Sequence, residues 1–310
     1  MPTWLKKHGR LLGNITFFAL IVVFLTLYLR DFDYDQLNGI ELRLEYLTVA
    51  VLSGLAFRFW GVVVWTKILE NLGAERLPNF RTMASVYGKA WMGRYIPGKV
   101  VWIAGKVLFA TKYGISKSRL GSSSILEAII QIVAIYAISL VFLLLDPRFD
   151  LVTDRLKWSL VIGGAALSVL VIPRVFNWLM GVCLELLGKS SLKGEASISS
   201  NAVLTAFKQY GVGYFISGIS YFFLTAAIYP IDFNSVFYVM ALFNIAGALG
   251  IASIITPSGL GVREGTQLLL LVAIMPKEIA LVVTALSRLF SVFVDVLFYI
   301  LTQIKPKETT

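Results

Sequence analysis

Long runs of apolar residues, separated by short polar stretches, dominate the chain. About 20 predominantly apolar residues are enough for an α-helix to cross the hydrocarbon core of a bilayer. By this criterion, membrane-spanning helices are expected at about 13–29, 47–69, 123–145, 210–229, 235–255 and 279–303. The pattern therefore predicts an all-α membrane protein.

Three other apolar stretches are interrupted. The stretch 157–188 is split at Pro173, which predicts either one kinked span or a span followed by a helix at the membrane interface. Residues 82–112 are apolar in patches, carry several basic residues and are broken at Pro97, so two short half-helices around a break are expected. The stretch TPSGLGVREG, residues 256–265, likewise separates two apolar runs.

The last third of the chain allows two topologies. If residues 257–275 cross the membrane, the spans total about eight and the C-terminus lies in the cytoplasm. If this segment enters the membrane and returns, the C-terminus lies outside. The basic end of the chain favours the first topology. We therefore expect a polytopic transmembrane helix bundle of about eight spans, with two proline–glycine breaks that are re-entrant or half-helical.

Composition supports this class. The chain is 57% hydrophobic and only 15% charged, with a mean hydropathy of +0.78, whereas about a quarter of the residues in a soluble domain are charged. The Ser/Lys-rich stretch 189–201 is the clearest hydrophilic loop and is too short to be a domain. Residues 1–310 are thus expected to form a single integral membrane domain, with no soluble catalytic domain.

The net charge of +10 alternates along the chain. Residues 1–12 carry +3, residues 30–46 carry −3 and residues 67–119 carry +8. Such alternation is typical of the positive-inside bias of membrane proteins. It predicts a multi-pass protein of the cell (inner or plasma) membrane with its N-terminus in the cytoplasm. The basic charge thus indicates topology and attraction to anionic lipids, and we expect no nucleic-acid partner.

Cysteine and histidine are too scarce for most site chemistries. Cys183 is the only cysteine and His8 the only histidine, so a disulfide framework, a Cys/His zinc site and a haem motif cannot be built. A catalytic triad would have to use His8, which lies in the basic N-terminal stretch. No cluster of Asp and Glu suggests a carboxylate metal site. We therefore expect neither an enzyme nor a cofactor or metal.

The TPSGLGVREG break carries the chemistry of a candidate ligand site. Backbone groups left unpaired inside a bilayer are tolerated where protein or a water-filled cavity receives them, and broken helices of transporters use them to bind ligands. Gly259 and Gly261 permit a sharp turn. Arg263, near the start of the next half-helix, supplies a phosphate-binding fork, which Glu264 could pair with or hold in place. The alternative is an interfacial loop in which Arg263 reaches the lipid headgroups.

A second break resembles the first. RYIPGKVVWIAGK, residues 94–106, also combines a proline–glycine pair with basic residues. Pro97 precedes the ionisable Glu127 by 30 residues, and Pro257 precedes Arg288 by 31. This similarity suggests an internal repeat, with a transporter site between the halves. The halves would be residues 47–145 and 210–303.

Four ionisable residues lie within apolar spans: Arg58, Glu127, Arg288 and Asp295. Each costs about 2.5–3.5 kcal/mol at the centre of a membrane helix. One interpretation is structural pairing, for example of Glu127 with Arg288 or Arg58; the other is a polar path for a lipid headgroup. If the halves face each other, Glu127 and Arg288 are expected to meet at mid-depth.

Together, the two motifs resemble a known family. TPSGLGVREG is similar to the Pro-Gly-Gly-(Leu/Ile)-Gly-x-Arg-Glu signature of the lysylphosphatidylglycerol synthase transmembrane region, also called flippase-like integral membrane proteins. RYIPGKVVWIAGK is similar to an earlier signature of that family. Ser258 stands where the signature has its first glycine. The resemblance implies a polytopic bundle that moves an anionic or modified lipid between leaflets, here without the synthase domain.

Our leading hypothesis is a flippase for a phospholipid or a lipid-linked headgroup, so the expected partners are membrane lipids. The alternatives are a membrane-embedded transferase acting on a lipid phosphate, or a non-catalytic partner of a glycosyltransferase or lipid synthase. The residues expected to bind the headgroup are Arg94, Pro97, Gly98, Lys99, Glu127, Pro257, Gly259, Gly261, Arg263, Glu264, Arg288 and Asp295.

Overall fold

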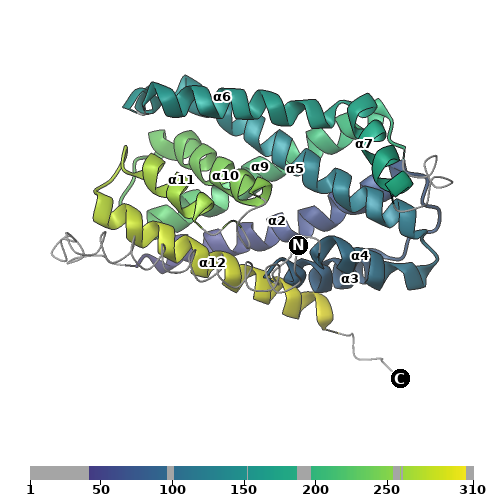
Figure 1. Cartoon of the computed structure of the whole chain (residues 1–310). Coiled ribbons are helices and arrows are strands. Elements are labelled where there is room, and N and C mark those ends of the chain that lie inside the picture. The colour runs from purple at the N-terminus through teal and green to yellow at the C-terminus, as the bar shows by residue number, and fades with distance from the viewer. Residues whose placement is uncertain are drawn as a thin grey trace, which may run out of the picture. The chain divides into compact units, whose positions relative to one another are not determined.

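The computed structural model describes residues 42–95, 101–151, 153–186, 197–253, 259 and 261–304. Within these ranges every regular element is a helix (Figure 1), which confirms the predicted all-α fold. The span expected at 13–29, both prolines of the two breaks and most of the hydrophilic loop 189–201 lie outside the described residues.

Five helices in the described part of the chain are long and apolar enough to cross a membrane. They are α2 (Leu44–Asn71), α5 (Lys117–Leu145), α9 (Ser200–Ile228), α10 (Val236–Ala252) with the 3-10 turn η7 before it (Phe233–Ser235), and α12 (Lys277–Gln303). They correspond to the spans expected at 47–69, 123–145, 210–229, 235–255 and 279–303. These five predictions are therefore confirmed as apolar helices of spanning length.

Two of these helices begin earlier than predicted because a serine caps each of them. The hydroxyl of Ser116 accepts a hydrogen bond from the amide of Arg119, and that of Ser199 accepts one from the amide of Ala202, each at 3.2 Å. Serine is among the preferred N-cap residues. A prediction from hydrophobic runs alone leaves out these first turns, because they contain polar residues.

The stretch 157–188 is bent. Helix α6 (Asp154–Ser168) continues into the 3-10 turn η5 (Val169–Val171), and α7 (Pro173–Leu186) leaves at an angle of 73°. Proline disfavours helical backbone in the residue before it, so the chain bends where the sequence predicts. The bend accords with both predicted readings, a kinked span or a span followed by an interfacial helix.

The 82–112 stretch forms two short helices, α3 (Phe80–Met92) and α4 (Val101–Ala110), with the 3-10 turn η2 (Gly93–Tyr95) after α3. The two helices are antiparallel and closely packed. A Cβ atom built on Gly93 would lie 3.1 Å from the amide nitrogen of Trp102, and one built on Gly105 would lie 3.1 Å from the Cα of Ala90. The predicted pair of half-helices is thus a helical hairpin, the first hairpin.

A second hairpin follows later in the chain. Helix α11 (Val262–Leu271) returns along α10, and the hydroxyl of Tyr238 in α10 donates to the carbonyl of Leu270 in α11 at 2.8 Å. With ten residues, α11 is about 15 Å long, half the thickness of the hydrocarbon core. It cannot cross the bilayer alone, although the sequence favoured a crossing here. The described residues contain five spans, or six with the bent pair, so the count of about eight is not confirmed.

The order long helix, helical hairpin, long helix therefore occurs twice, as α2, α3–α4, α5 and as α9, with η7 and α10–α11, then α12. Helix α2 packs on α9, and in each series the second helix of the hairpin packs on the long helix after it. The first helix of each hairpin packs on the last long helix of the other series: α3 on α12, and α10 on α5. The two series coincide with the suggested repeat halves 47–145 and 210–303; the repeat itself stays a prediction.

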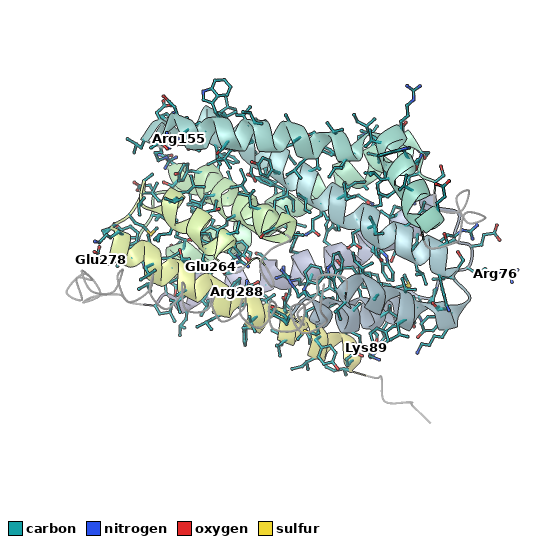
Figure 2. All side chains as sticks on the ribbon, viewed as in Figure 1. Arg76, Lys89, Arg155, Glu264, Glu278 and Arg288 are labelled. Atoms are coloured by element: carbon teal, nitrogen blue, oxygen red, sulfur yellow. The ribbon has the colours of Figure 1, made fainter. Side chains whose placement is uncertain are left out.

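Many large apolar side chains project outward (Figure 2). Leu108, Leu145, Trp158, Trp178 and Leu289 are all mostly exposed. Exposed apolar surface on this scale is typical of a protein surrounded by lipid. The interior, in contrast, holds several buried charged residues, namely Arg58, Lys106, Glu127, Arg263 and Asp295.

Candidate functional site

The ends of the two hairpins meet at a cavity of about 70 Å³. It is lined by residues of α2, α3, η2, α5, α9, α10, α11 and α12: Phe57, Arg58, Trp91, Arg94, Gln131, Ile135, Ser217, Tyr221, Phe243, Asn244, Gly247, Ala248, Gly250, Ile251, Arg263 and Ser291. A space of this size has room for several water molecules.

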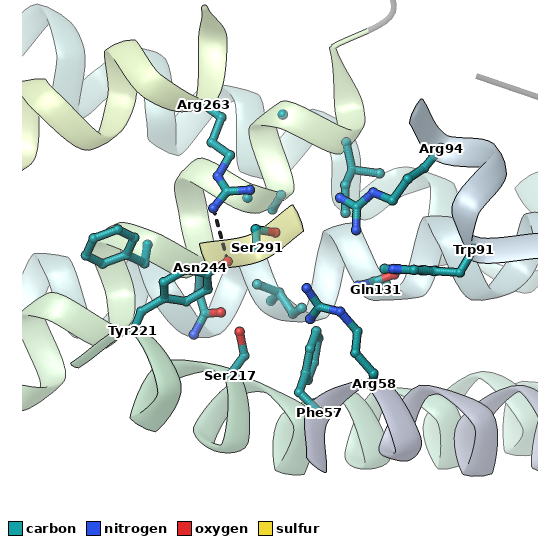
Figure 3. Close-up of a pocket in the computed structure, with 16 residues that line it drawn as sticks. Phe57, Arg58, Trp91, Arg94, Gln131, Ser217, Tyr221, Asn244, Arg263 and Ser291 are labelled. Atoms are coloured by element: carbon teal, nitrogen blue, oxygen red, sulfur yellow. Dashed lines mark hydrogen bonds between the residues drawn. The ribbon is translucent and has the colours of Figure 1, made fainter. Parts of the chain in front are cut away.

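Three arginines from three elements point into this space (Figure 3): Arg58 from α2, Arg94 from η2 and Arg263 from α11. A single buried carboxylate, Asp295 of α12, serves two of them. Its oxygens lie 2.5 Å from Nε of Arg58 and 3.4 Å from Nη1 of Arg94, and the hydroxyl of Tyr95 also donates to it at 2.5 Å. The three guanidinium charges therefore exceed the carboxylate charge that binds them, which favours an added anion.

Arg263 has spare hydrogen-bonding capacity. Its side chain is 6% exposed, and its Nη2 donates to the hydroxyl of Tyr221 at 3.0 Å. The Nε–H group is buried with no hydrogen-bond partner among the described residues. An unsatisfied buried donor costs about 1–3 kcal/mol, and more when it is charged. An acceptor that enters the cavity would remove this cost.

Tyr221 holds the Arg263 head group in place. The tyrosine ring stacks on Phe243 at a centroid distance of 4.8 Å, and the guanidinium carbon lies 5.6 Å from the tyrosine centroid. Because the ring is fixed between α9 and α10, the cation–π and hydrogen-bond contacts together restrict the orientation of the guanidinium. A restricted fork is suited to bidentate binding of a phosphate or carboxylate.

The turn before α11 has the chemistry expected from the sequence. Gly259 and Gly261 have φ values of 71° and 85°, a region that glycine adopts without strain. A Cβ atom on Gly259 would lie 2.5 Å from the Cα of Gly250, so this turn is pressed against the end of α10. The carboxylate of Glu264 accepts a hydrogen bond from the amide of Gly261 at 2.8 Å and caps α11. Glu264 thus helps to hold the turn that presents Arg263.

The expected meeting of Glu127 and Arg288 is wrong. Glu127 of α5 forms a fully buried ion pair with Lys106 of α4, and it accepts a hydrogen bond from the hydroxyl of Tyr87 at 2.8 Å. Arg288 of α12 lies 3.6 Å from Glu264 of α11, and the two residues are labelled on neighbouring helices in Figure 2. In each series the short helix packs against the long helix that follows it, so these charges find partners within their own half.

The alternative pairing of Glu127 with Arg58 is also wrong. Arg58 instead pairs with Asp295, which lies 237 positions away in the chain. Asp295 in turn binds both Arg58 and Arg94. Glu127, Glu264 and Asp295 therefore bind different basic residues. Of the three, only Asp295 binds arginines that line the cavity.

The residues expected to bind the headgroup thus divide into four groups. Arg94 and Arg263 line the cavity, and Asp295 binds two of its arginines. Gly259 and Gly261 shape the turn, while Glu127, Glu264 and Arg288 form ion pairs away from the cavity lining. Pro97, Gly98, Lys99 and Pro257 lie outside the described residues.

Sequence reasoning missed several lining residues. Trp91 and Tyr221 line the cavity, but aromatic residues make up 13% of the chain, so no local signal marked these two. Gln131 and Asn244 also line it, and their polar side chains within apolar helices could have marked them. Lys106 could have been found by the same criterion as the other buried charges, because it is ionisable and lies in an apolar half-helix. In the part of the chain that the structure describes, no three His, Cys, Asp or Glu side chains gather as a metal site would require.

Comparison with protein families identifies the chain. Residues 12–298 match the model of the lysylphosphatidylglycerol synthase TM region. The match covers nearly the whole chain, so the protein belongs to this family, as its two motifs suggested. Family and helices together make it a multi-pass membrane protein related to lipid modification or transport. No curated protein sequence matches the chain.

Proposed function

We propose that the protein is a lipid flippase that moves a phospholipid or lipid-linked headgroup between the leaflets of the cell membrane. The headgroup phosphate would bind in the arginine cavity while the acyl chains remain in the bilayer. The observation that carries this proposal is the buried Nε–H group of Arg263, a residue that lines a cavity with two other arginines; this group has no acceptor among the described residues. A phosphate oxygen supplies both the acceptor and the charge.

The hairpin geometry supports the same function. Helix α11 begins at the cavity, so its free backbone amides and the positive end of its dipole add to the attraction for an anion. Sites of this kind, at the ends of discontinuous helices and between repeated halves, occur in secondary transporters. Access would alternate between the two sides of the membrane as one hairpin moves relative to the other.

Asp295 has a defined part in this cycle. Its carboxylate binds both Arg58 and Arg94. A phosphate that enters would compete for the same guanidinium groups, so Arg94 would be released from Asp295. The longer contact, 3.4 Å to Arg94, is the weaker of the two and would be lost first.

Reconstitution in liposomes tests the proposal. Fluorescent phospholipids and polyprenyl phosphates are placed in one leaflet and their appearance in the other is measured for wild type, Arg263→Ala and the control Arg155→Ala. Arg155 is exposed on α6, far from the cavity lining. We expect transport by wild type and the control but not by Arg263→Ala. A covalently altered lipid would instead indicate a transferase, and neither result would indicate a partner of another enzyme.

A further inference from the structure

A second hollow lies on the first hairpin, away from the arginine cavity. This groove has a volume of about 1060 Å³ and is lined by Lys89, Ala90, Met92, Gly93, Val101, Ala104, Gly105, Val107, Leu108, Phe109, Thr111, Lys112 and Lys117. Most of the lining is apolar. Its residues come from α3, α4 and the segment that joins α4 to α5, so the groove follows the seam of the hairpin.

Small residues make the groove possible. Ala90, Gly93, Ala104 and Gly105 line it, and α3 and α4 approach so closely that a Cβ on Gly105 would lie 3.1 Å from the Cα of Ala90. The neighbouring Leu108 side chain is 72% exposed. A seam of small residues beside exposed large apolar ones leaves an elongated apolar channel on the protein surface.

The groove matches an acyl chain in length. It runs along α4, whose ten residues extend over about 15 Å. This length is half the hydrocarbon thickness, that is, one leaflet. A single acyl chain that lies along α4 would therefore reach from the level of the headgroups to the middle of the bilayer.

The charge of the groove is confined to lysines. Lys112 and Lys117 lie where α4 ends and α5 begins, and Lys89 lies on α3; Figure 2 labels Lys89 at the edge of the hairpin. All three belong to the stretch 67–119, which carries +8. Lys112 and Lys117, which lie at the same end of the groove, would attract an anionic lipid headgroup, whereas a zwitterionic headgroup gains less from them.

We propose that this groove binds one acyl chain of an anionic phospholipid, with the lipid phosphate at Lys112 and Lys117. The inner end of the groove is at Gly93, the residue before Arg94 of the cavity. A lipid bound here thus rests against the hairpin that carries one of the cavity arginines. Binding of a lipid in the groove does not depend on the proposed flippase activity. A role of the groove as the route by which a lipid reaches the cavity does rest on that proposed function.

A photoreactive side chain at Leu108 identifies the occupant directly. The full-length protein carrying p-benzoylphenylalanine at this position is reconstituted in bilayers of phosphatidylglycerol and phosphatidylcholine, irradiated and analysed by mass spectrometry. We expect adducts with the mass of phosphatidylglycerol, in excess over its share of the bilayer. An adduct with a peptide from residues 1–41, or with a second copy of the chain, would overturn the proposal.

Two further variants test the lysines and the groove itself. Lys112→Gln with Lys117→Gln is expected to reduce the excess of phosphatidylglycerol adducts roughly thirtyfold, while Lys208→Gln, an exposed lysine of α9 outside the groove, leaves it unchanged. Ala104→Phe fills the groove and is expected to reduce adducts with both lipids; Val141→Phe, on the exposed side of α5, is its control. Unchanged adducts in the lysine and Ala104 variants would refute the site. Because adduct formation requires no transport, Arg263→Ala should label normally even if the proposed function fails.

Discussion

The carboxylate of Asp295 lies 2.5 Å from Nε of Arg58, and Asp295 has no exposed surface. This buried contact joins α12 to α2, and the second oxygen of Asp295 reaches Arg94 of the first hairpin. One carboxylate therefore connects three elements around the cavity. The contact that joins these elements would also compete with any anion that binds in the cavity.

Asp295→Asn tests this double role. Removal of the charge leaves Arg58 buried without its anion, which typically costs about 3–5 kcal/mol. We expect a lower thermal stability in detergent, together with a larger stabilisation by added anionic phospholipid than wild type shows. The measurement is the unfolding temperature with and without lipid. Equal stabilisation of both proteins would mean that Asp295 and the lipid do not compete.

Arg263→Ala is expected to abolish or strongly reduce transport with little loss of stability. The side chain donates to Tyr221, and no ion pair with another described residue would be left uncompensated by an alanine. Arg263→Lys should restore transport only in part, because lysine offers a point charge and no planar fork. Transport rates in liposomes and unfolding temperatures are compared. Normal transport by the alanine variant would exclude Arg263 from the site.

Substitution of Gly259 and of Gly261 distinguishes the effect of backbone strain from the effect of steric crowding. Both have positive φ, where valine is strained, but only Gly259 lacks room, since its Cβ would meet the backbone of Gly250 at 2.5 Å. We therefore expect Gly259→Val to lower stability and expression more than Gly261→Val. Equal effects would show that the close packing on Gly250 contributes little.

The buried pair of Lys106 and Glu127 is expected to couple strongly. Either Lys106→Met or Glu127→Gln strands one buried charge and costs roughly 3–5 kcal/mol, whereas the double variant costs clearly less than the sum. Glu127→Gln with Arg288→Gln is the control, because these residues have different partners and their effects should add. A thermal-stability cycle measures both pairs. Additivity in the first cycle would contradict the pairing.

The turn after α5 predicts a dependence of stability on pH. Although partial burial acts to raise the pKa of Asp146, hydrogen bonds from Arg148 outweigh it and hold this pKa below its ordinary value of 3.8. A lowered pKa contributes stability that is complete above 3.8 and disappears as the pH falls through the folded-state pKa. We expect Asp146→Asn to be less stable than wild type near neutral pH and to lose less stability on acidification. The measurement is the unfolding temperature of both proteins as a function of pH. Parallel curves would show that Asp146 does not contribute to the pH dependence of stability.

The sequence alone determined the features that depend on neighbouring residues. Apolar runs of spanning length fold into helices in the membrane wherever they occur in a chain, so the spans at 47–69, 123–145 and 279–303 could be predicted. A proline interrupts a helix locally, which explains why the bend at Pro173 and the division of 82–112 were also predicted. Likewise, the turn glycines and the place of Arg263 at the start of a helix follow from ten consecutive residues.

The tertiary structure alone decided which charges meet. Each buried charge needs a counter-charge in a medium of low dielectric constant, but several pairings of the charged residues in the sequence would satisfy that requirement equally well. The packing of α4 on α5 and of α11 on α12 brings Lys106 to Glu127 and Glu264 to Arg288, while α2 and α12 bring Arg58 to Asp295. The cavity depends on the same packing, since its lining comes from helices distant in the chain. When nearly every face of a helix is apolar, a single sequence does not indicate which face packs against which neighbouring helix.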